Sequence, residues 1–311
     1  MKVAIFGGTG FVGTYLIDAL LRAGHQPLVL TRPGSEGKLE QPERCRLTPG
    51  YIEDREAVAA TLDGADAAIY NIGILREDPA RGISFSGLQL EGAKRAMDAA
   101  VAAGARRFLL MSANGVRADG TAYQRTKLEA EQYLATSGLD WTVFRPSVLF
   151  GDPHGKQEFA TQLYRDIIKS PLPAPLFYEG LWPSNPGGYA MSPVHVEDVA
   201  HAFVASLEDP NAIGRIFPLG GPEELTWKQI LQIIATATGR KLFALPAPAF
   251  GIRSLATLLD RFAFFPITRD QLTMLLEGNT CDGSEAFDTF KIEPKAFNVE
   301  NLAYLKGNDS E

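Results

Sequence analysis

The sequence predicts an α/β fold built on a doubly wound, mostly parallel sheet, and two observations lead to this fold class. Short apolar runs alternate with segments of helical periodicity over the first 150 residues, as strands and helices do along a parallel sheet. The first apolar run, residues 3–6, ends in glycine and is followed by apolar residues at helical spacing. In such a sheet the binding crevice lies at the carboxyl ends of the strands. Residues that directly follow each predicted strand are therefore the candidate site residues.

Gly7, Gly10 and Gly13 follow the first predicted strand at three-residue spacing. Glycine at positions 7 and 10 lets the backbone turn tightly and approach a pyrophosphate, and at position 13 it lets the helix lie close to the strand. The phosphates would then face free N–H groups and the positive end of the helix dipole. A glycine turn without a ligand is the alternative. The position between a clear strand and a clear helix favours a dinucleotide-binding site.

Six strands and their connecting helices can be placed along this part of the chain. The strands are expected at residues 3–6, 26–31, 45–48, 67–72, 107–112 and 141–145, and helices at 53–62, 84–103 and 122–134 follow the first one. From residue 151 the composition shifts toward proline, glycine and aromatic residues. We therefore divide the chain into a nucleotide-binding domain at 1–150 and a substrate or lid region at 151–311, with segments that return to the first domain.

Arg32 directly follows the second predicted strand. An NAD-selective site usually has an acidic residue here to bind the ribose 2′-hydroxyl, whereas an arginine suits a 2′-phosphate. The sequence thus predicts NADP(H) in preference to NAD(H), with a solvated surface arginine as the alternative. The fourth predicted strand ends in Asn71, Ile72 and Gly73, a small and uncharged end that suits a cofactor ribose and pyrophosphate.

Tyr123 and Lys127 are four residues apart on a predicted helix, and Ser112 ends a predicted strand. This spacing places the phenol and the ammonium on one helix face. An ammonium about 4 Å away would lower the pKa of a phenol toward the range in which it acts as a general acid. Tyr123 would supply the proton, Ser112 would stabilise the developing alkoxide, and the nicotinamide would supply the hydride. A surface helix pair is the alternative for Tyr123 and Lys127.

The other ionisable residues near these motifs are expected to have structural roles. Asp198 should stabilise a helix N-terminus, with His195 at the edge of the pocket, because acidic residues favour the first helical turn. Glu129 and Glu131 should lie on the solvated face of the helix that carries Tyr123.

Composition excludes several classes of function. The net charge is −7 without a cluster of Lys and Arg, which argues against nucleic acid as a partner. Cys45 and Cys281 are too few for a disulfide framework or a zinc site, and the four histidines lack metal-ligand spacing, so we expect no metal. No apolar run approaches the ~20 residues that span a bilayer, and no signal peptide is expected before the first strand. The expected location is cytoplasmic or membrane-peripheral.

Two segments of the C-terminal region are unusually apolar. Residues 171–182 are rich in proline and aromatic residues, and Phe262, Phe264 and Phe265 end a predicted amphipathic helix. We interpret them as an apolar cleft for a hydrophobic substrate, or as an edge that contacts a membrane or a protein complex. The alternative is that these phenylalanines fill the C-terminal core.

The GGTGFVG segment at residues 7–13, Ser112, and Tyr123-x-x-x-Lys127 together resemble the short-chain dehydrogenase/reductase superfamily, extended type, also described as epimerase/dehydratase-like. Further segments are similar to one atypical branch, which contains the accessory NADPH-binding subunit of respiratory complex I and its free-standing bacterial relatives. These segments are NIGILRE (71–77), MSANGV (111–116), YQRTKLEAE (123–131), FRPSVLFG (144–151), HVEDVA (195–200), LGGPEELTWKQI (219–230) and TRDQLTMLLEGN (268–279).

The resemblance implies a Rossmann domain with a smaller C-terminal substrate region, and it assigns cofactor contacts by position. The pyrophosphate contacts would come from Gly7, Thr9, Gly10, Phe11, Val12 and Gly13, and the adenosine phosphate contact from Arg32. Asn71, Ile72 and Gly73 would flank the cofactor, Lys127 would touch the nicotinamide ribose, and Pro146 and Val148 would border the nicotinamide. The interval from Ser112 to Tyr123 is much shorter than in sugar epimerases and dehydratases.

Taken with the apolar C-terminal segments, the resemblance leads us to predict an NADP(H)-binding oxidoreductase that acts on a hydrophobic small molecule. The complex I subunit is regarded as binding NADPH without turning it over. A redox-silent NADPH-binding assembly or regulatory protein is therefore the main alternative, and a nucleotide-sugar epimerase or dehydratase is a third.

Overall fold

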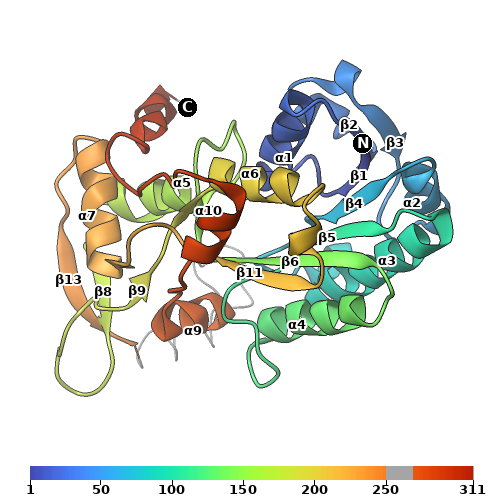
Figure 1. The fold of residues 1–311 in the computed structure, drawn as a ribbon. Helices are drawn as coiled ribbons and strands as arrows, with labels where there is room; N and C mark the ends of the chain where they lie inside the picture. The colour runs from blue at the N-terminus through green and yellow to red at the C-terminus, as the bar shows by residue number, and fades with distance from the viewer. Residues whose placement is uncertain (250–268, 311) are drawn as a thin grey trace. The chain divides into compact units, whose positions relative to one another are not determined.

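The computed structural model describes residues 1–249 and 269–310, and the chain forms two compact units (Figure 1). The first unit contains Met1–Pro146, Val196–Leu219 and Glu285–Glu293. The second unit contains the remaining described residues. The prediction for Phe262, Phe264 and Phe265 lies outside the described residues.

A seven-stranded parallel sheet forms the centre of the first unit, in the order β11-β6-β5-β4-β1-β2-β3. Its strands are β1 (Lys2–Phe6), β2 (Gln26–Thr31), β3 (Arg46–Pro49), β4 (Ala67–Tyr70), β5 (Arg107–Met111), β6 (Asp140–Pro146) and β11 (Arg215–Leu219). The chain starts in the middle of the sheet and runs outward in both directions, so the strand order reverses between β1 and β4. This is the doubly wound α/β fold that the sequence predicts.

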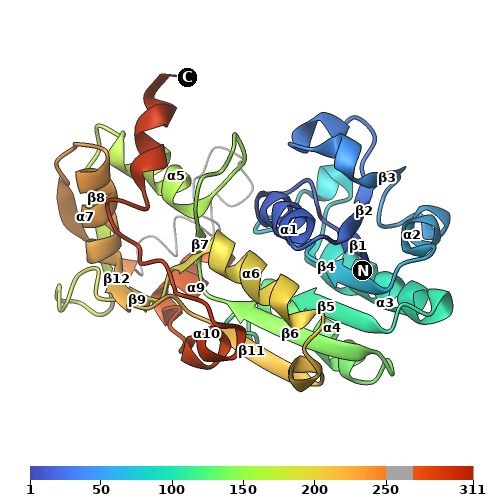
Figure 2. The same cartoon turned by 45° about the horizontal axis from the view of Figure 1, so that its top comes forward.

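Helices cover both faces of this sheet (Figure 1). On one face α1 (Phe11–Arg22) packs against α6 (Val196–Ser206), and on the other α3 (Gly92–Ala103) contacts both α2 (Arg55–Leu62) and α4 (Ala122–Ala135). Figure 2 shows the first pair from a second direction. The inner strands β1, β2, β4 and β5 are almost wholly buried between the two helical layers, which explains their continuous apolar runs.

The remaining elements of the first unit are short. They are the 3₁₀ turns η1 (Glu36–Lys38), η2 (Pro42–Arg44), η3 (Pro79–Arg81) and η6 (Pro210–Ala212), the π-helical turn η4 (Ser86–Glu91), and most of α10 (Ser284–Phe290). Phe290 of α10 packs edge-on against Phe217 of β11, with ring centroids 5.0 Å apart. The phenylalanine pair fixes α10 to the outermost strand of the sheet.

The helix predicted at 84–103 begins instead with the π-helical turn η4. The cause is Tyr70, whose hydroxyl donates a hydrogen bond to the Leu88 carbonyl inside this turn. A Cβ atom at Gly92, where α3 starts, would lie 2.4 Å from the Tyr70 hydroxyl. The wider turn and Gly92 together make room for a tyrosine from the neighbouring strand.

A buried ion pair connects α4 with β5 and β6. Arg145 of β6 donates two hydrogen bonds to the Glu131 carboxylate, and the hydroxyl of Ser112, at the end of β5, donates to the same group. The Glu131 side chain is only 5% exposed. The prediction that Glu131 lies on the solvated face of α4 is therefore wrong, whereas Glu129 is exposed as expected. The helical period turns Glu131 and Lys127 to the inward face and Glu129 away from it.

The described part of the second unit contains three small two-stranded sheets. β7 (Leu149–Phe150) pairs with β10 (Val194–His195), β8 (Ala174–Tyr178) with β13 (Ala244–Pro248), and β9 (Ala190–Met191) with β12 (Leu225–Thr226). Its helical elements are α5 (Phe159–Leu163), the π-helical turn η5 (Tyr164–Ile168), α7 (Trp227–Ala237), α9 (Arg269–Glu277) and η7 (Ala303–Ser310).

Trp227 lies in the core of the second unit. The indole is buried beside Phe177, and its N–H donates to the Pro175 carbonyl at 2.9 Å. Thr226 caps α7 in a capping box with Gln229, which fixes the start of this helix. No described helix is long and apolar enough to cross a membrane.

Glu131→Gln should lower the free energy of unfolding by about 2–4 kcal/mol, because it leaves the partly buried Arg145 guanidinium without a counter-charge. Glu129→Gln is the matched control on the same helix. Since Glu129 is exposed, its replacement should change stability by less than about 0.5 kcal/mol. Urea unfolding followed by circular dichroism measures both. Equal costs for the two variants would contradict a structural role for the ion pair.

Candidate functional site

The glycine turn after β1 brings three stretches of backbone together. Gly7 has φ +97°, and a Cβ atom there would lie 2.9 Å from the carbonyl carbon of Asn71. A Cβ atom at Gly13 would lie 2.2 Å from the Gly7 carbonyl oxygen. Both positions therefore require glycine, and α1 packs closely against the turn as predicted.

The N-terminus of α1 faces this turn. Gly10 occupies the N-cap position and no side chain caps the helix. Thr9, Phe11 and Val12 are half-buried around the turn. An uncapped helix N-terminus next to a glycine turn carries a positive partial charge and N–H groups that suit a phosphate. The geometry fits a pyrophosphate, and the contacts themselves stay a prediction.

Two further predicted segments lie at the adjacent strand ends. Asn71 directly follows β4, and its N–H donates to the Phe6 carbonyl at 2.9 Å, so residues 71–73 lie beside the glycine turn. Arg32 directly follows β2, the strand on the other side of β1. The Arg32 side chain is exposed and has no acidic partner among the described residues. The sheet order thus places Arg32 and Asn71 on opposite sides of the turn.

Lys127 lies at the ends of β4 and β5. The side chain is buried, and its ammonium donates to the Met111 carbonyl at 2.8 Å and to the Ile72 carbonyl at 3.5 Å. A Cβ atom at Gly73 would be 3.6 Å from the ammonium nitrogen. Burial lowers the pKa of Lys127 to about 8, although the Glu131 carboxylate one turn along the helix raises it.

Tyr123 lies one turn before Lys127 on the same face of α4. Its ring packs edge-on against Phe85, with centroids 5.8 Å apart, and its hydroxyl has no hydrogen-bond partner among the described residues. Burial raises the pKa of Tyr123 to about 12. The expectation that Lys127 lowers this pKa is not met, because apolar surroundings disfavour the phenolate while the ammonium hydrogen-bonds to backbone carbonyls.

Ser112 is buried at the end of β5. Its N–H donates to the Phe144 carbonyl at 2.8 Å, and its hydroxyl hydrogen is used by Glu131. Two residues further, Asn114 is half-buried, and its N–H donates to the carbonyl of Pro146, the last residue of β6. The structure therefore brings Ser112 to Glu131, and no hydrogen bond joins Ser112 to Tyr123.

The remaining candidates belong to different parts of the chain. Val148 is in the second unit, where its carbonyl accepts a hydrogen bond from Val194. His195, also in that unit, is buried and packs edge-on against Phe150. Asp198 is buried in the first turn of α6 in the first unit, as expected of a residue that stabilises a helix N-terminus.

Gln89 is a site residue that sequence reasoning missed. It lies in the π-helical turn η4 and is 1% exposed. Its amide nitrogen donates to the Ile74 carbonyl at 2.9 Å, and its amide oxygen accepts from the Thr126 hydroxyl at 3.0 Å. Thr126 directly precedes Lys127, so Gln89 holds α4 against the segment that follows β4. A polar residue between Leu88 and Leu90 is the one signal in the sequence.

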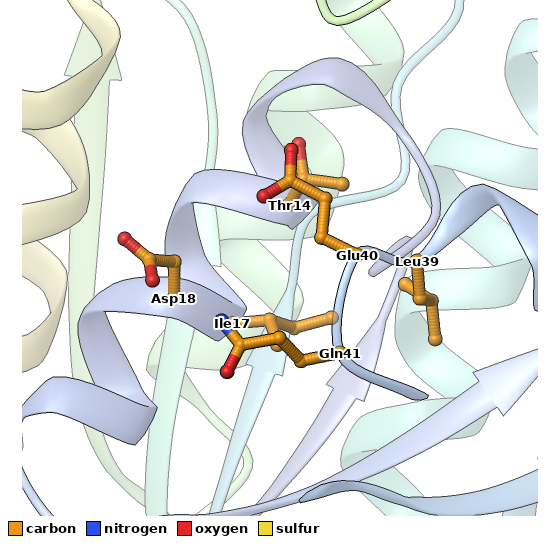
Figure 3. Close-up of a pocket in the computed structure, with 6 residues that line it drawn as sticks. All are labelled: Thr14, Ile17, Asp18, Leu39, Glu40 and Gln41. Carbon is orange, nitrogen blue, oxygen red and sulfur yellow. The ribbon is translucent and has the colours of Figure 1, made fainter. Parts of the chain in front are cut away.

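Two other features do not form a site. A small pocket lies between α1 and residues 39–41, with Asp18 and Glu40 among the residues around it (Figure 3). It has room for about one water molecule and cannot hold a nucleotide. Within the described residues, no group of three or more His, Cys, Asp or Glu side chains is placed to hold a metal ion.

Comparison with known proteins reveals sequence relatives. Residues 7–166, just over half of the chain, match the family model described as NAD(P)H-binding. The chain is 30% identical over 243 residues to NADH dehydrogenase [ubiquinone] 1 alpha subcomplex subunit 9, mitochondrial, of Arabidopsis thaliana, and the match covers 74% of this chain and 56% of that protein. It is 29% identical to a ceramide reductase of Caulobacter vibrioides, covering 84% of this chain and 78% of the reductase.

The chain spans just over half the length of the Arabidopsis relative. Among solved structures, UDP-glucose 4-epimerase of Thermus thermophilus in complex with NAD has a TM-score of 0.75 at 19% identity, with both chains covered completely. The epimerase of Thermotoga maritima has a TM-score of 0.71 at 19% identity, covering 99% of this chain and 98% of the epimerase. These two likenesses show the fold alone. With the glycine turn, the helix that carries Tyr123 and Lys127, and the family match, the chain belongs to the NAD(P)H-binding family and is an extended, atypical short-chain dehydrogenase/reductase-like protein.

Proposed function

We propose that this protein is an NADP(H)-dependent oxidoreductase that reduces a carbonyl or an activated carbon of a hydrophobic small molecule. The proposal rests on the observation that Tyr123 and Lys127 share the face of α4 that lies at the strand ends. Lys127 lies against the carbonyls of Met111 and Ile72, and Tyr123 lies one turn away with a hydroxyl that has no partner among the described residues. A proton donor must keep its hydroxyl available for a substrate.

The chain's own residues fit a dinucleotide. Gly7 and Gly13 leave no room for a side chain where a pyrophosphate would approach the turn, and the first turn of α1 supplies N–H groups. Arg32 would bind the 2′-phosphate of NADP(H), and Lys127 would bind the nicotinamide ribose. When bound, the nicotinamide supplies or accepts a hydride.

Tyr123 would hold the proton for this reaction. A phenol with a pKa of about 12 is fully protonated at neutral pH, so it is a donor in the direction of reduction. Lys127, with a pKa of about 8, carries most of its charge at neutral pH and would orient the ribose. Because the Ser112 hydroxyl donates to Glu131, we assign Ser112 a positioning role rather than contact with the substrate alkoxide.

Two relatives support a reductase, the first of them one with an apolar substrate. The ceramide reductase is the first. A 3-diazoavenalumate denitrifying reductase of a Streptomyces species is the second, 29% identical over 234 residues, covering 67% of this chain and 72% of that protein. A ceramide carries long hydrocarbon chains, which an apolar surface binds. A cytoplasmic or membrane-peripheral location belongs to the same proposal.

The alternative is a redox-silent NADPH-binding protein that works in assembly or regulation. The specific observation in its favour is the similarity to complex I subunits, together with the internal use of the Ser112 hydroxyl. For a nucleotide-sugar epimerase or dehydratase the support comes from solved structures such as two at 19% and 18% identity, which show the fold alone.

NADPH should bind at least about tenfold more tightly than NADH, because the Arg32 contact with a phosphate is charge-assisted. Arg32→Ala should remove this difference. Arg22→Ala, at the far end of α1 and largely exposed, is the matched control and should preserve it. Titration calorimetry measures all affinities, and equal affinities in the unmutated protein would contradict the assignment of Arg32.

Tyr123→Phe should lower turnover about 10²–10⁴-fold, the usual contribution of a positioned acid, while NADPH affinity stays within about twofold. Tyr133→Phe is the matched control, because Tyr133 is on the same helix and donates to Asp98 outside the site. It should leave turnover unchanged. Steady-state kinetics with a panel of apolar carbonyl compounds tests both, and unchanged turnover in Tyr123→Phe would rule out the phenol as donor. No turnover of any panel member would favour the redox-silent alternative.

The affinity for NADPH should decrease as the pH rises through about 8. Below that pH the Lys127 ammonium is charged and attracts the anionic cofactor, and above it the charge is lost. Lys127→Met should bind NADPH more weakly and show no such decrease. Fluorescence titration between about pH 7 and 10 measures this, in a range where the 2′-phosphate keeps a constant charge. Parallel pH curves for the two proteins would contradict the contact.

A further inference from the structure

One surface of the second unit combines cations with large exposed apolar side chains. We define it as the basic–apolar patch, formed by Lys169, Leu172, Arg240, Lys241, Phe243 and Leu245. Leu172 is 72% exposed and Phe243 is 64% exposed. Large apolar side chains at this exposure keep most of their surface in water, and a group of them on one surface indicates a binding site.

The strand β13 and the residues before it have an unusual alternation. Leu242 and Ala244 pack against the core of the second unit, while Lys241, Phe243 and Leu245 are exposed. A strand with one solvated face normally carries polar residues there. Here the exposed face carries one cation and two large apolar side chains.

Hydrogen bonds and ring contacts bring the other patch residues to the same place. The Ala174 N–H donates to the Phe243 carbonyl at 2.8 Å, so the start of β8, preceded by Leu172, lies beside Phe243. The Lys169 ammonium lies 5.5 Å from the centroid of the Tyr164 ring, and the Arg240 guanidinium carbon 5.8 Å from the same centroid. Two cations from distant segments thus share one aromatic ring.

Two of the three cations of the patch, Arg240 and Lys241, are not balanced by ion pairs within the described residues, although the whole chain carries a net charge of −7. Cations next to exposed leucine and phenylalanine are the combination that an anionic lipid surface attracts, since the headgroups bind the charges and the acyl region accepts the apolar side chains.

We propose that the basic–apolar patch docks the second unit onto the surface of a membrane that contains anionic lipids. The charge complementarity favours a lipid surface over a second copy of the chain, because a second copy would bring three further cations to the same contact if it paired with itself. The proposal does not depend on cofactor binding or turnover.

Flotation with phosphatidylcholine vesicles, with and without phosphatidylglycerol, tests the docking. The full chain should float with the anionic vesicles and not with the neutral ones, and high salt should release it. Lys169→Glu with Lys241→Glu should weaken binding to anionic vesicles at least about tenfold, because each cation near an anionic surface raises the membrane affinity several-fold. Phe243→Ser with Leu245→Ser should weaken it as well.

Two double variants are matched controls. Arg22→Glu with Arg106→Glu makes the same change in net charge at exposed positions of the first unit. Leu181→Ser with Trp182→Ser removes two exposed apolar side chains beyond the other end of β8. The charge control should bind anionic vesicles as tightly as the unmutated protein does. The apolar control should lose less of this binding than the variant with Phe243→Ser and Leu245→Ser.

Three results would overturn the proposal. The first is that the unmutated protein binds neutral and anionic vesicles equally, or binds neither. The second is that the charge control loses as much binding to anionic vesicles as the Lys169 and Lys241 double variant. The third is that the Phe243 and Leu245 changes convert a dimer to a monomer, as measured by sedimentation velocity. The last would assign the patch to a second copy. NADPH titration of the same variants separates the two proposals, because failure of cofactor binding leaves the vesicle result intact.

Discussion

Close approach of backbone to backbone at the glycine turn is the constraint on which the first unit depends. Gly7 has no space for a side chain because the chain leaving β4 passes beside it, and Gly13 has none because α1 begins almost in contact with the turn. These contacts fix the start of the helix relative to two strand ends. The residues of the turn, and Arg32 and Asn71 after the two strands paired with β1, are positioned from this point.

Burial, more than charge, controls the ionisation of the groups on α4. It raises the pKa of Tyr123 and lowers that of Lys127, so burial shifts each group toward its neutral form. Glu131 opposes this effect at Lys127, and it is itself held by Arg145 and Ser112. Tyr123, Lys127 and Glu131 therefore lie one turn apart along α4, and the Glu131 carboxylate raises the pKa of Lys127.

The elements whose signals are local could be predicted from the sequence. The first strand and the glycine turn that follows it depend on residues a few positions apart, and both are found as expected. The burial of Glu131 could not be predicted, because its partner Arg145 lies on the next strand. The π-helical turn likewise depends on Tyr70 from β4. Partners that lie on another helix or strand cannot be identified from the sequence of one element alone.

The seventh strand of the sheet has a consequence for how the chain can be made. β11 pairs with β6 along its whole length, yet many residues of the second unit separate them in the sequence. Until the ribosome has released β11, the hydrogen-bonding groups on the outer side of β6 have no strand to pair with. An exposed strand edge of this kind recruits other chains, and contacts so distant in sequence form slowly. Nascent chains that have emerged only as far as the second unit would therefore expose the unpaired outer edge of β6, which can pair with other chains. Chaperone protection during synthesis is thus most valuable before β11 has paired with β6 and α10 has covered Phe217.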